Sequence, residues 1–240
     1  MENKKISIVT VVYNSFINIE DTILSVINQN YKNIEYIIID GDSTDGTKEI
    51  IRKHNENISY WISEPDNGIY DAMNKGIKVS NGDWILFLNA GDLFYNYNVL
   101  SKVNLEMNNC DVIYGKTAIK QKNGDLLIRN YYPLKMDWKV IPYCHQSVFI
   151  KSIFLKEILF ETKYNIAADY NQYFKLKTKK LKFKPINEII SIYDMNGLSS
   201  LNNKKLLSEY KKIALSNHIN LLTRFKIIIY YFLKTLLNKI

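Results

Sequence analysis

Four short apolar runs recur in the first part of the chain, and they constrain the fold more than any other feature. They are Ile6–Val12, Ile34–Ile39, Ile58–Ile62 and Trp84–Leu88. Stretches with apolar residues at helical spacing separate them, over 18–29, 43–54 and 69–79, and Ser43 or Thr44 is the expected cap of the second helix. Continuous apolar strands that alternate with helices are typical of a parallel sheet covered on both faces. The pattern therefore predicts an α/β fold with a Rossmann-like, mostly parallel sheet.

A cluster of polar side chains follows each predicted strand directly. The clusters are Tyr13-Asn14, Asp40–Asp45, Ser63–Asp66 and Asn89–Asp92. The carboxyl ends of parallel strands meet at one edge of a sheet, and folds of this class bind their ligands there. We therefore expect the four clusters to line one site.

The stretch IIIDGDSTDGTKEII, residues 37–51, is similar to a phosphate-binding loop in its two glycines and in the helix that follows. A P-loop requires Gly-Lys-Thr where this chain has Gly46-Thr47-Lys48, and Asp42 and Asp45 would repel a bare phosphate. Carboxylates can instead accept hydrogen bonds from a ribose or a base, or hold a divalent cation that binds a diphosphate. A nucleoside-binding loop is the favoured reading, and a P-loop NTPase is the weaker alternative.

The pattern changes after Asp92. Helices are predicted over 97–107 and 166–176, and strands over 110–119, 126–132, 145–150, 181–184 and 188–193. This mixture predicts that the second half completes a mixed sheet and forms the acceptor side of a cleft. Because no Pro/Gly/Ser-rich linker interrupts the chain, we expect one catalytic domain over 1–215, with a nucleotide-binding half at 1–95 and an acceptor half at 96–215.

Positive charge is concentrated near the C-terminus. The net charge is +8, and residues 171–240 hold 14 Lys and Arg against 3 Asp and Glu, a local charge of +11. Such a segment should meet an anionic partner. Nucleic acid is disfavoured, because the aromatic residues alternate with aliphatic ones and form no basic stacking surface.

The last 20 residues, LLTRFKIIIYYFLKTLLNKI, have the pattern of an amphipathic helix. Their longest uninterrupted apolar run, Ile227–Leu233, is seven residues and too short to span a bilayer. Phe225, Ile229, Phe232, Leu236 and Ile240 recur at helical spacing. The pattern predicts a basic, membrane-associating helix over 216–240 that lies in the interface of an anionic membrane. The alternative is a helix docked on the domain, with its lysines in solvent.

Seven stretches in a fixed order carry a family resemblance. They are ISIVTVVYN, IEYIIIDGDSTDGT, EPDNGIYDAMNKGI, NGDWILFLNAGD, HQSVF, IAADY and GLSS. Together they resemble the family 2 glycosyltransferases with a GT-A fold, especially bacterial enzymes of surface polysaccharide assembly such as capsule or O-antigen. The resemblance implies inverting hexosyl or N-acetylhexosaminyl transfer from a nucleotide-diphosphate sugar, by default a UDP-sugar. The acceptor would be a glycan hydroxyl, lipid-linked in our reading, at the inner face of the bacterial cell membrane.

The resemblance also implies roles for particular residues. The Thr10–Asn14 region, with Thr10, Tyr13 and Asn14, and Asp40 would line the nucleoside pocket. Asp92 corresponds to the last aspartate of the Asp-x-Asp metal motif, which implies Mn²⁺ or Mg²⁺, and Asp169 in IAADY matches the general base. Inversion needs one displacement and a carboxylate that takes the proton of the attacking hydroxyl.

Two departures from the family pattern affect these roles. Many members have Asp-Asp where this chain has Asp40-Gly41, so Asp42 is a second candidate for base contacts. The metal triplet reads Ala90-Gly91-Asp92, preceded by Asn89, and one carboxylate with a diphosphate and waters can still hold Mg²⁺. A non-catalytic homologue that binds a sugar nucleotide, or serves as a scaffold, is therefore the main alternative function.

Further donor and acceptor candidates come from the residues themselves. Asp71 and Asn74 lie one helical turn apart and would share a face toward the donor, unless that face is ordinary helix surface. Asn89 and Ala90 would border the donor at the end of the fourth strand. His145 and Gln146 would contact the diphosphate or the acceptor, with a packed strand histidine as the alternative.

Overall fold

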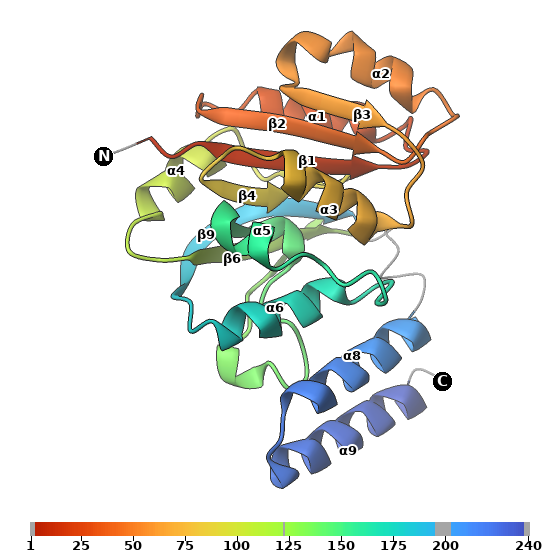
Figure 1. Cartoon of the computed structure of the whole chain (residues 1–240), viewed down its shortest axis with the longest axis vertical. Helices are drawn as coiled ribbons and strands as arrows, with labels where there is room; N and C mark the ends of the chain where they lie inside the picture. Colours follow the sequence, from red (N-terminus) through yellow and green to blue (C-terminus); the bar gives the residue numbers. More distant parts are fainter. Residues whose placement is uncertain (1–2, 122, 195–202, 238–240) are drawn as a thin grey trace.

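One mixed sheet forms the centre of the computed structural model, which describes residues 3–121, 123–194 and 203–237. The strands in these residues are β1 Ile6–Val12, β2 Ile34–Asp40, β3 Tyr60–Ser63, β4 Trp84–Phe87, β5 Leu93–Phe94, β6 Val112–Lys120, β7 Leu126–Arg129, β8 Val148–Lys151 and β9 Phe183–Asp194. Their order is β3-β2-β1-β4-β8-β6-β9-β5, and β7 pairs with β6 (Figure 1). The strands β1 to β4 are parallel to one another, and β8 runs antiparallel to both β4 and β6.

Helices cover both faces of the sheet, as the continuous apolar strands predict. They are α1 Ile19–Ile27, α2 Thr47–Lys53, α3 Ile69–Val79, α4 Val99–Glu106, α5 Ser152–Glu157, α6 Ala168–Thr178, α8 Asn203–Asn217 and α9 Leu221–Leu237. Alternate side chains of β1 enter two separate cores: Ile8 packs in the core that contains α1, and Val9 in the core that contains α3. Burial on both faces is the reason why β1 is apolar at almost every position.

The register of the parallel strands brings their carboxyl ends to one edge. Val12 of β1 lies opposite Asp40 of β2, and Asp40 lies opposite Ser63 of β3. Beyond β4, the Ala90 N–H still bonds the Val11 carbonyl at 3.2 Å. The four polar clusters predicted to meet at this edge therefore do meet there.

The helix α3 lies very close to β1. A Cβ atom on Gly76 would be 2.4 Å from Cγ1 of Val9, which is inside van der Waals contact. Glycine at this position lets the helix backbone approach the strand. This close packing fixes the N-terminal end of α3, with Tyr70, beside the carboxyl edge of the sheet.

The structure differs from the sequence prediction at several boundaries. The helix α2 begins at Thr47 after Gly46, which has φ +99°, so neither Ser43 nor Thr44 caps it. Residues His145–Ser147 form a 3₁₀ turn, and the strand begins only at Val148. The segments predicted as two strands near 181 and 193 form the single strand β9, whose pairing with β6 shifts register around Gly115. The elements β5, α5 and α8 were not predicted.

The two C-terminal helices form a hairpin that packs on α6 (Figure 1). Tyr210 of α8 stacks on Tyr170 of α6, with ring centroids 4.4 Å apart, and Ile227 and Tyr231 are the buried residues of α9. The predicted boundary at residue 215 falls inside α8. The last member of the predicted apolar stripe, Ile240, and the GLSS motif lie outside the described residues. No helix in the described part of the chain combines the length and the apolar character that crossing a membrane requires.

Candidate active site

The loop after β2 is bonded to the loop after β1. Asn14, with φ +45°, donates its N–H to Ser43 Oγ at 2.8 Å and accepts the Thr44 N–H at 2.9 Å. Asp45 accepts the Phe16 N–H at 3.0 Å. These bonds join the loop after β1 to the loop after β2 through polar groups of the motif. The Asp45 carboxylate thus has a partner in the neighbouring loop, at a place where a P-loop has no acidic residue.

Asp42 is exposed in this motif, and the half-buried Lys48 lies beside it. Asp42 has φ +65°, and its carboxylate pairs with Lys48 Nζ at 3.1 Å. In a P-loop the lysine would contact phosphate. The pairing of Lys48 with Asp42 speaks against the NTPase alternative.

Asp40 and Thr10 lie below the surface of this edge, and both are fully buried. Asp40 accepts hydrogen bonds from the Ser43 N–H at 3.0 Å and from the hydroxyls of Ser43 and Ser63. Thr10 donates to the Leu88 carbonyl at 2.8 Å. In this structure the two side chains therefore support the loops that border the site.

Gly41 leaves a space that another residue fills. A Cβ on Gly41 would lie 2.5 Å from Asp66 Oδ2 and 3.4 Å from the ring of Tyr13. The Asp66 carboxylate thus stands where a side chain at position 41 would begin, while its Oδ1 accepts the Gly68 N–H at 2.8 Å. Tyr13 is 66% exposed beside it. The sequence pattern places Asp66 in the polar cluster after the third strand but predicts no contact with position 41.

The predicted pair on α3 does not share a face toward a ligand. Asn74 is buried, and its amide donates to the Phe160 carbonyl and accepts the Phe160 N–H, each at 2.9 Å. This expectation for Asn74 is corrected, because both of its polar groups hold the segment after α5. Asp71 accepts the Asn67 N–H at 3.0 Å and stays at the rim.

A line of polar groups joins the end of β4 to α6. The Asn89 amide nitrogen lies 3.0 Å from His145 Nε2, and His145 Nδ1 lies 4.0 Å from Asp169 Oδ2. With the Asn89 amide in this orientation its nitrogen donates to Nε2, which assigns the ring proton to Nδ1, on the side of Asp169. Burial lowers the pKa of His145 to about 4, which keeps the ring neutral at pH 7.

Asp169 lies in the first turn of α6 with a largely buried carboxyl. Burial raises the pKa of Asp169 to about 6, against the effect of hydrogen bonds from the Tyr170 N–H and the Tyr70 hydroxyl. The Tyr70 hydroxyl is 3.4 Å from Oδ1. A carboxyl of this kind is mostly ionised at pH 7 and still basic enough to accept a proton. Tyr70 was not predicted as part of this arrangement.

Asp92 and Asp169 both influence the half-buried Cys144 thiol electrostatically. Burial raises the pKa of the Cys144 thiol, and the Asp169 and Asp92 carboxylates both act on it in the same direction. The acid after β4 and the acid on α6 are therefore both within electrostatic reach of one side chain. Gln146, next to His145, is buried, and little of its side chain is open to a ligand.

The end of β4 carries two oxygen groups of the kind that bind divalent cations, without a complete set of protein ligands in the described residues. Within the described residues no group of three or more His, Cys, Asp or Glu could hold a metal ion. Asp92 supplies one carboxylate, and the buried Asn89 Oδ1 has no hydrogen-bond partner in the described part of the chain. Carboxylate and amide oxygens are the ligands that Mg²⁺ and Mn²⁺ prefer, and Ala90 borders them.

A family model for glycosyl transferase family 2 matches residues 7–180. The chain belongs to glycosyl transferase family 2. An uncharacterised glycosyltransferase of Rickettsia typhi is 32% identical over 184 residues, which cover 71% of this chain and 58% of that protein. One of Mycobacterium tuberculosis is 31% identical over 179 residues, covering 68% and 65%. The chain thus spans about three fifths of the length of these relatives.

Two solved structures share the fold. The chain matches Staphylococcus aureus TarS in complex with UDP-GlcNAc with a TM-score of 0.72, at 16% identity, over 95% of this chain and 71% of that one. It matches a mannosyltransferase of Pyrobaculum calidifontis in complex with GDP-Man and Mn²⁺ with a TM-score of 0.71, at 14% identity, over 96% and 70%. The predicted GT-A fold, a mixed sheet flanked by helices, is confirmed.

We expect the Asp169 carboxyl to titrate near pH 6, well above an ordinary aspartate, because it is buried. The measurement is a ¹³C NMR titration of the aspartate carboxyl carbons, with the Asp169 signal identified by its loss in Asp169→Asn. A midpoint near 4 for this signal would show that the carboxyl is solvated and would remove the physical basis of its role as a base.

Proposed function

We propose that this family 2 chain is an inverting glycosyltransferase that moves a hexosyl or N-acetylhexosaminyl group from a nucleotide-diphosphate sugar to a glycan hydroxyl. The observation that carries the proposal is the line from Asn89 through His145 to Asp169. It joins the strand edge, where folds of this class bind ligands, to a buried carboxyl whose pKa suits proton transfer.

The nucleoside of the donor binds between Tyr13 and the loop after β2. The exposed ring of Tyr13 provides a stacking face, and the Asp66 carboxylate beside Gly41 accepts an N–H of the base or a ribose hydroxyl. Asp40 and Thr10 support this pocket from below, and Asn14 fixes its rim. UDP is the expected nucleotide, in keeping with the complex of TarS with UDP-GlcNAc.

The sugar is transferred in one displacement. The acceptor oxygen forms a bond to the anomeric carbon as the bond from that carbon to the phosphate oxygen breaks, with the electron pair leaving on the diphosphate. Asp169 takes the proton of the attacking hydroxyl. The neutral His145 holds its Nδ1 proton toward Asp169, so it helps to orient the ionised carboxylate and leaves Oδ1 to Tyr70. Inversion of the anomeric carbon follows from the single displacement.

Asp92 and Asn89 Oδ1 would hold a divalent cation, Mn²⁺ or Mg²⁺. When bound, the cation would neutralise charge on the leaving diphosphate. One similar structure contains Mn²⁺ together with GDP-Man, which supports the proposal. In this chain the orphaned amide oxygen of Asn89 takes the place of a second carboxylate.

Substitution of Asp169 and Asp92 tests the function. Purified protein is given a panel of radiolabelled UDP- and GDP-sugars with Mn²⁺, and release or transfer of the sugar is measured. Asp169→Asn should reduce turnover by about 10²-fold or more with unchanged donor affinity, because only the proton acceptor is lost. Asp92→Ala should weaken both donor binding and turnover, because a cation ligand is lost.

Exposed Asp125→Asn, in the β6–β7 turn, is the matched control and should behave as wild type. A wild-type protein that binds a donor but turns none over would favour the non-catalytic alternative. Full turnover by Asp169→Asn would remove that residue from the reaction.

Exchange of side chains between positions 41 and 66 tests the donor pocket. Asp66→Ala should weaken binding of UDP or GDP about tenfold, since one hydrogen bond to a charged group is lost. Gly41→Asp alone should also weaken it, because its Cβ would meet Asp66 Oδ2 at 2.5 Å. The double variant should regain part of the affinity, measured by calorimetry. Equal affinity in Asp66→Ala and wild type would show that the carboxylate does not touch the nucleotide.

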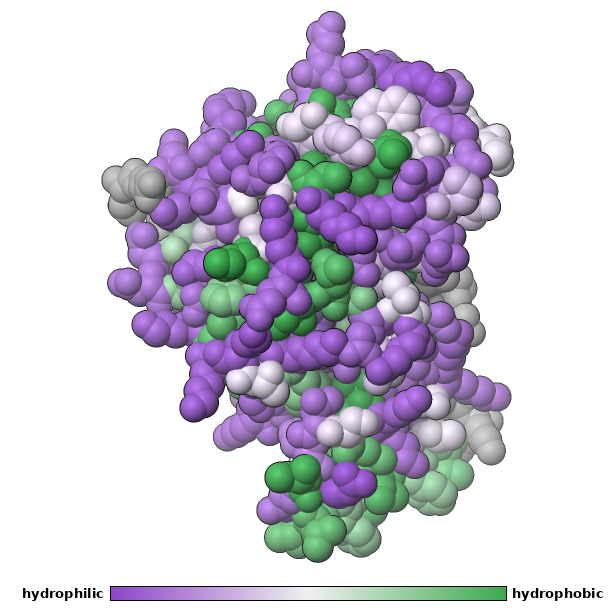
Figure 2. Space-filling view, in the orientation of Figure 1, coloured by the Kyte–Doolittle hydropathy of each residue, from purple (hydrophilic) through white to green (hydrophobic). Residues whose placement is uncertain are grey.

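The acceptor is proposed to be lipid-linked, and the α8–α9 hairpin to lie on the membrane that carries it. Apolar surface gathers at the lower end of the molecule, where Figure 1 places the turn between α8 and α9 (Figure 2). Large apolar side chains are exposed along α9, with Leu221 at 83%, Phe225 at 64% and Phe232 at 60%. The buried Ile227 and Tyr231 dock α9 on the domain. One face of α9 is thus docked and the other is free for lipid.

Charge favours the same surface. Residues 203–237, which form the hairpin, hold seven Lys and Arg against the single Glu209, a net charge of +6 that attracts an anionic lipid headgroup at roughly 1 kcal/mol per Lys or Arg near the surface. The proposed location is therefore the cytoplasmic side of a bacterial cell membrane, peripheral on the inner face. Nucleic acid is not a proposed partner.

The variant Phe225→Glu/Phe232→Glu should lose most of its binding to vesicles of phosphatidylglycerol and phosphatidylcholine. Each phenylalanine contributes about 2 kcal/mol when buried in the interface, so the bound fraction in co-sedimentation should fall more than tenfold. Ile153→Glu on α5, an equal change at a 69% exposed position, is the control. Binding by the double variant that equals the control would contradict the membrane proposal.

A further inference from the structure

The helix α6, which carries Asp169, begins without a side-chain cap of its own. Its N-cap residue is Ala167, and no side-chain cap bond is made there. The N–H groups at such a start need acceptors from elsewhere. The Glu209 carboxylate of α8 accepts the N–H group of the N-cap residue Ala167 and those of Asn165 and Ile166 just before the helix, each at 3.0 Å. One side chain thus binds three consecutive backbone donors.

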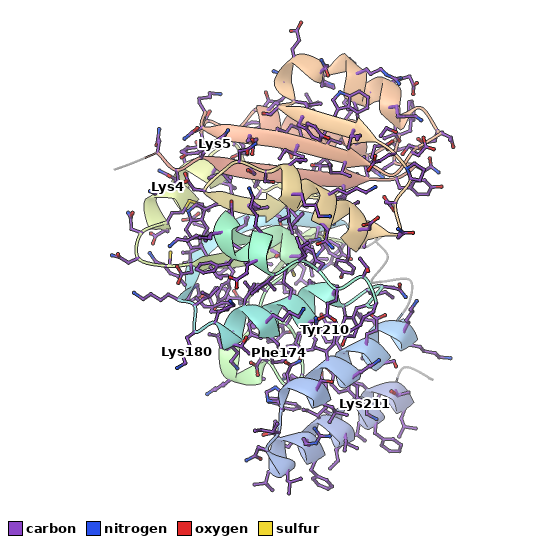
Figure 3. All side chains as sticks on the ribbon, viewed as in Figure 1. Lys4, Lys5, Phe174, Lys180, Tyr210 and Lys211 are labelled. Atoms are coloured by element: carbon purple, nitrogen blue, oxygen red, sulfur yellow. The ribbon has the colours of Figure 1, made fainter. Side chains whose placement is uncertain are left out.

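The same segment is held from its other side by α3. The Tyr70 hydroxyl donates to the Ile166 carbonyl at 2.8 Å and lies 3.4 Å from Asp169 Oδ1. Next to Glu209, Tyr210 stacks on Tyr170, the neighbour of Asp169 in the chain. Figure 3 shows Tyr210 on the side of α8 that faces α6. Contacts from two helices therefore converge on the first turn of α6.

We propose that Glu209 is a positioning residue for the reaction. By binding the N–H groups of residues 165–167 it fixes the first turn of α6, and with it the direction in which the Asp169 carboxylate faces His145. The inference rests on the proposed role of Asp169 as the base. Among the described residues, the hydrogen bonds of the Glu209 carboxylate go to the backbone before Asp169, so its effect passes through that backbone.

The other groups around Asp169 determine how strongly the charge of Glu209 affects the pKa of Asp169. In the described part of the chain the titratable groups that face Asp169 are Tyr70, Tyr143, Cys144, His145, Glu209 and Tyr210. Arg129 faces Cys144 and Tyr210 from β7. The tyrosines, the thiol and the histidine are neutral at pH 7, because burial moves each pKa toward the neutral form. Burial is the main cause of the raised pKa of Asp169, and the negative charge of Glu209 adds to it.

These charges set the direction in which the pKa of Asp169 should change when the Glu209 carboxylate is removed. Loss of the Glu209 carboxylate removes a negative charge and lets water reach the start of α6. Both changes stabilise the ionised form of Asp169, so the pKa of its carboxyl should fall. A residue that only stabilised the fold would lower the amount of folded protein without moving this titration.

The test uses full-length protein and two readouts that need no substrate. In Glu209→Gln, hydrogen exchange at residues 165–167 should become about tenfold faster, and the ¹³C midpoint of Asp169 should move down by about half a pH unit. Glu209→Ala should show both effects more strongly. Glu188→Gln, which removes a carboxylate paired with Lys102 on the surface, is the matched control and should leave both unchanged.

Unchanged exchange and an unchanged midpoint in folded Glu209→Gln would overturn the inference, whatever the enzyme does. If Glu209→Ala does not fold, Glu209→Gln decides alone, because it replaces one oxygen of a similar side chain. The proposed function fails by a different result, full turnover by Asp169→Asn. The two failures are therefore distinguishable.

Discussion

The parallel pairing of β2, β1 and β4 is the constraint on which the rest depends. The register sets Val12 opposite Asp40, and the bond from Ala90 to Val11 extends the alignment past β4. Val11 and Ala90, 79 positions apart in the chain (90 − 11), therefore meet at one edge of the sheet. The buried apolar strands provide the stability, and the loops are free to carry polar groups.

The buried strand ends also explain why so many polar residues of the site face inward. Asp40 and Thr10 are fully buried yet have their hydrogen bonds made by neighbouring loops and strands. Such bonds fix loop shapes at the edge of a rigid sheet. In the proposed site the contacts with the ligand are made by Tyr13 and Asp66, which lie closer to the solvent than Asp40 and Thr10. In the proposed site a buried set of polar groups therefore positions an exposed one.

The first half of the fold was predictable because its information is local. Apolar runs and helical spacing in residues 6–88 marked β1, β2, β4 and α3 to within two residues of the observed bounds. The strand edge followed from the rule for parallel sheets. The second half was less predictable: β9 contains Pro185, which made one strand look like two, and β5 has only two residues.

The roles of Asn74, Asp66 and Glu209 depended on packing that no local pattern contains. Asn74 has the spacing of a ligand residue on α3, but its partner is the Phe160 backbone 86 positions later. Glu209 reaches residues 42 to 44 positions earlier, from a helix that looked like part of a basic tail. That helix belongs to the hairpin whose outer face is apolar. The element proposed to meet the membrane is thus the one bonded to the start of α6, so its packing and the geometry of the proposed base are physically joined.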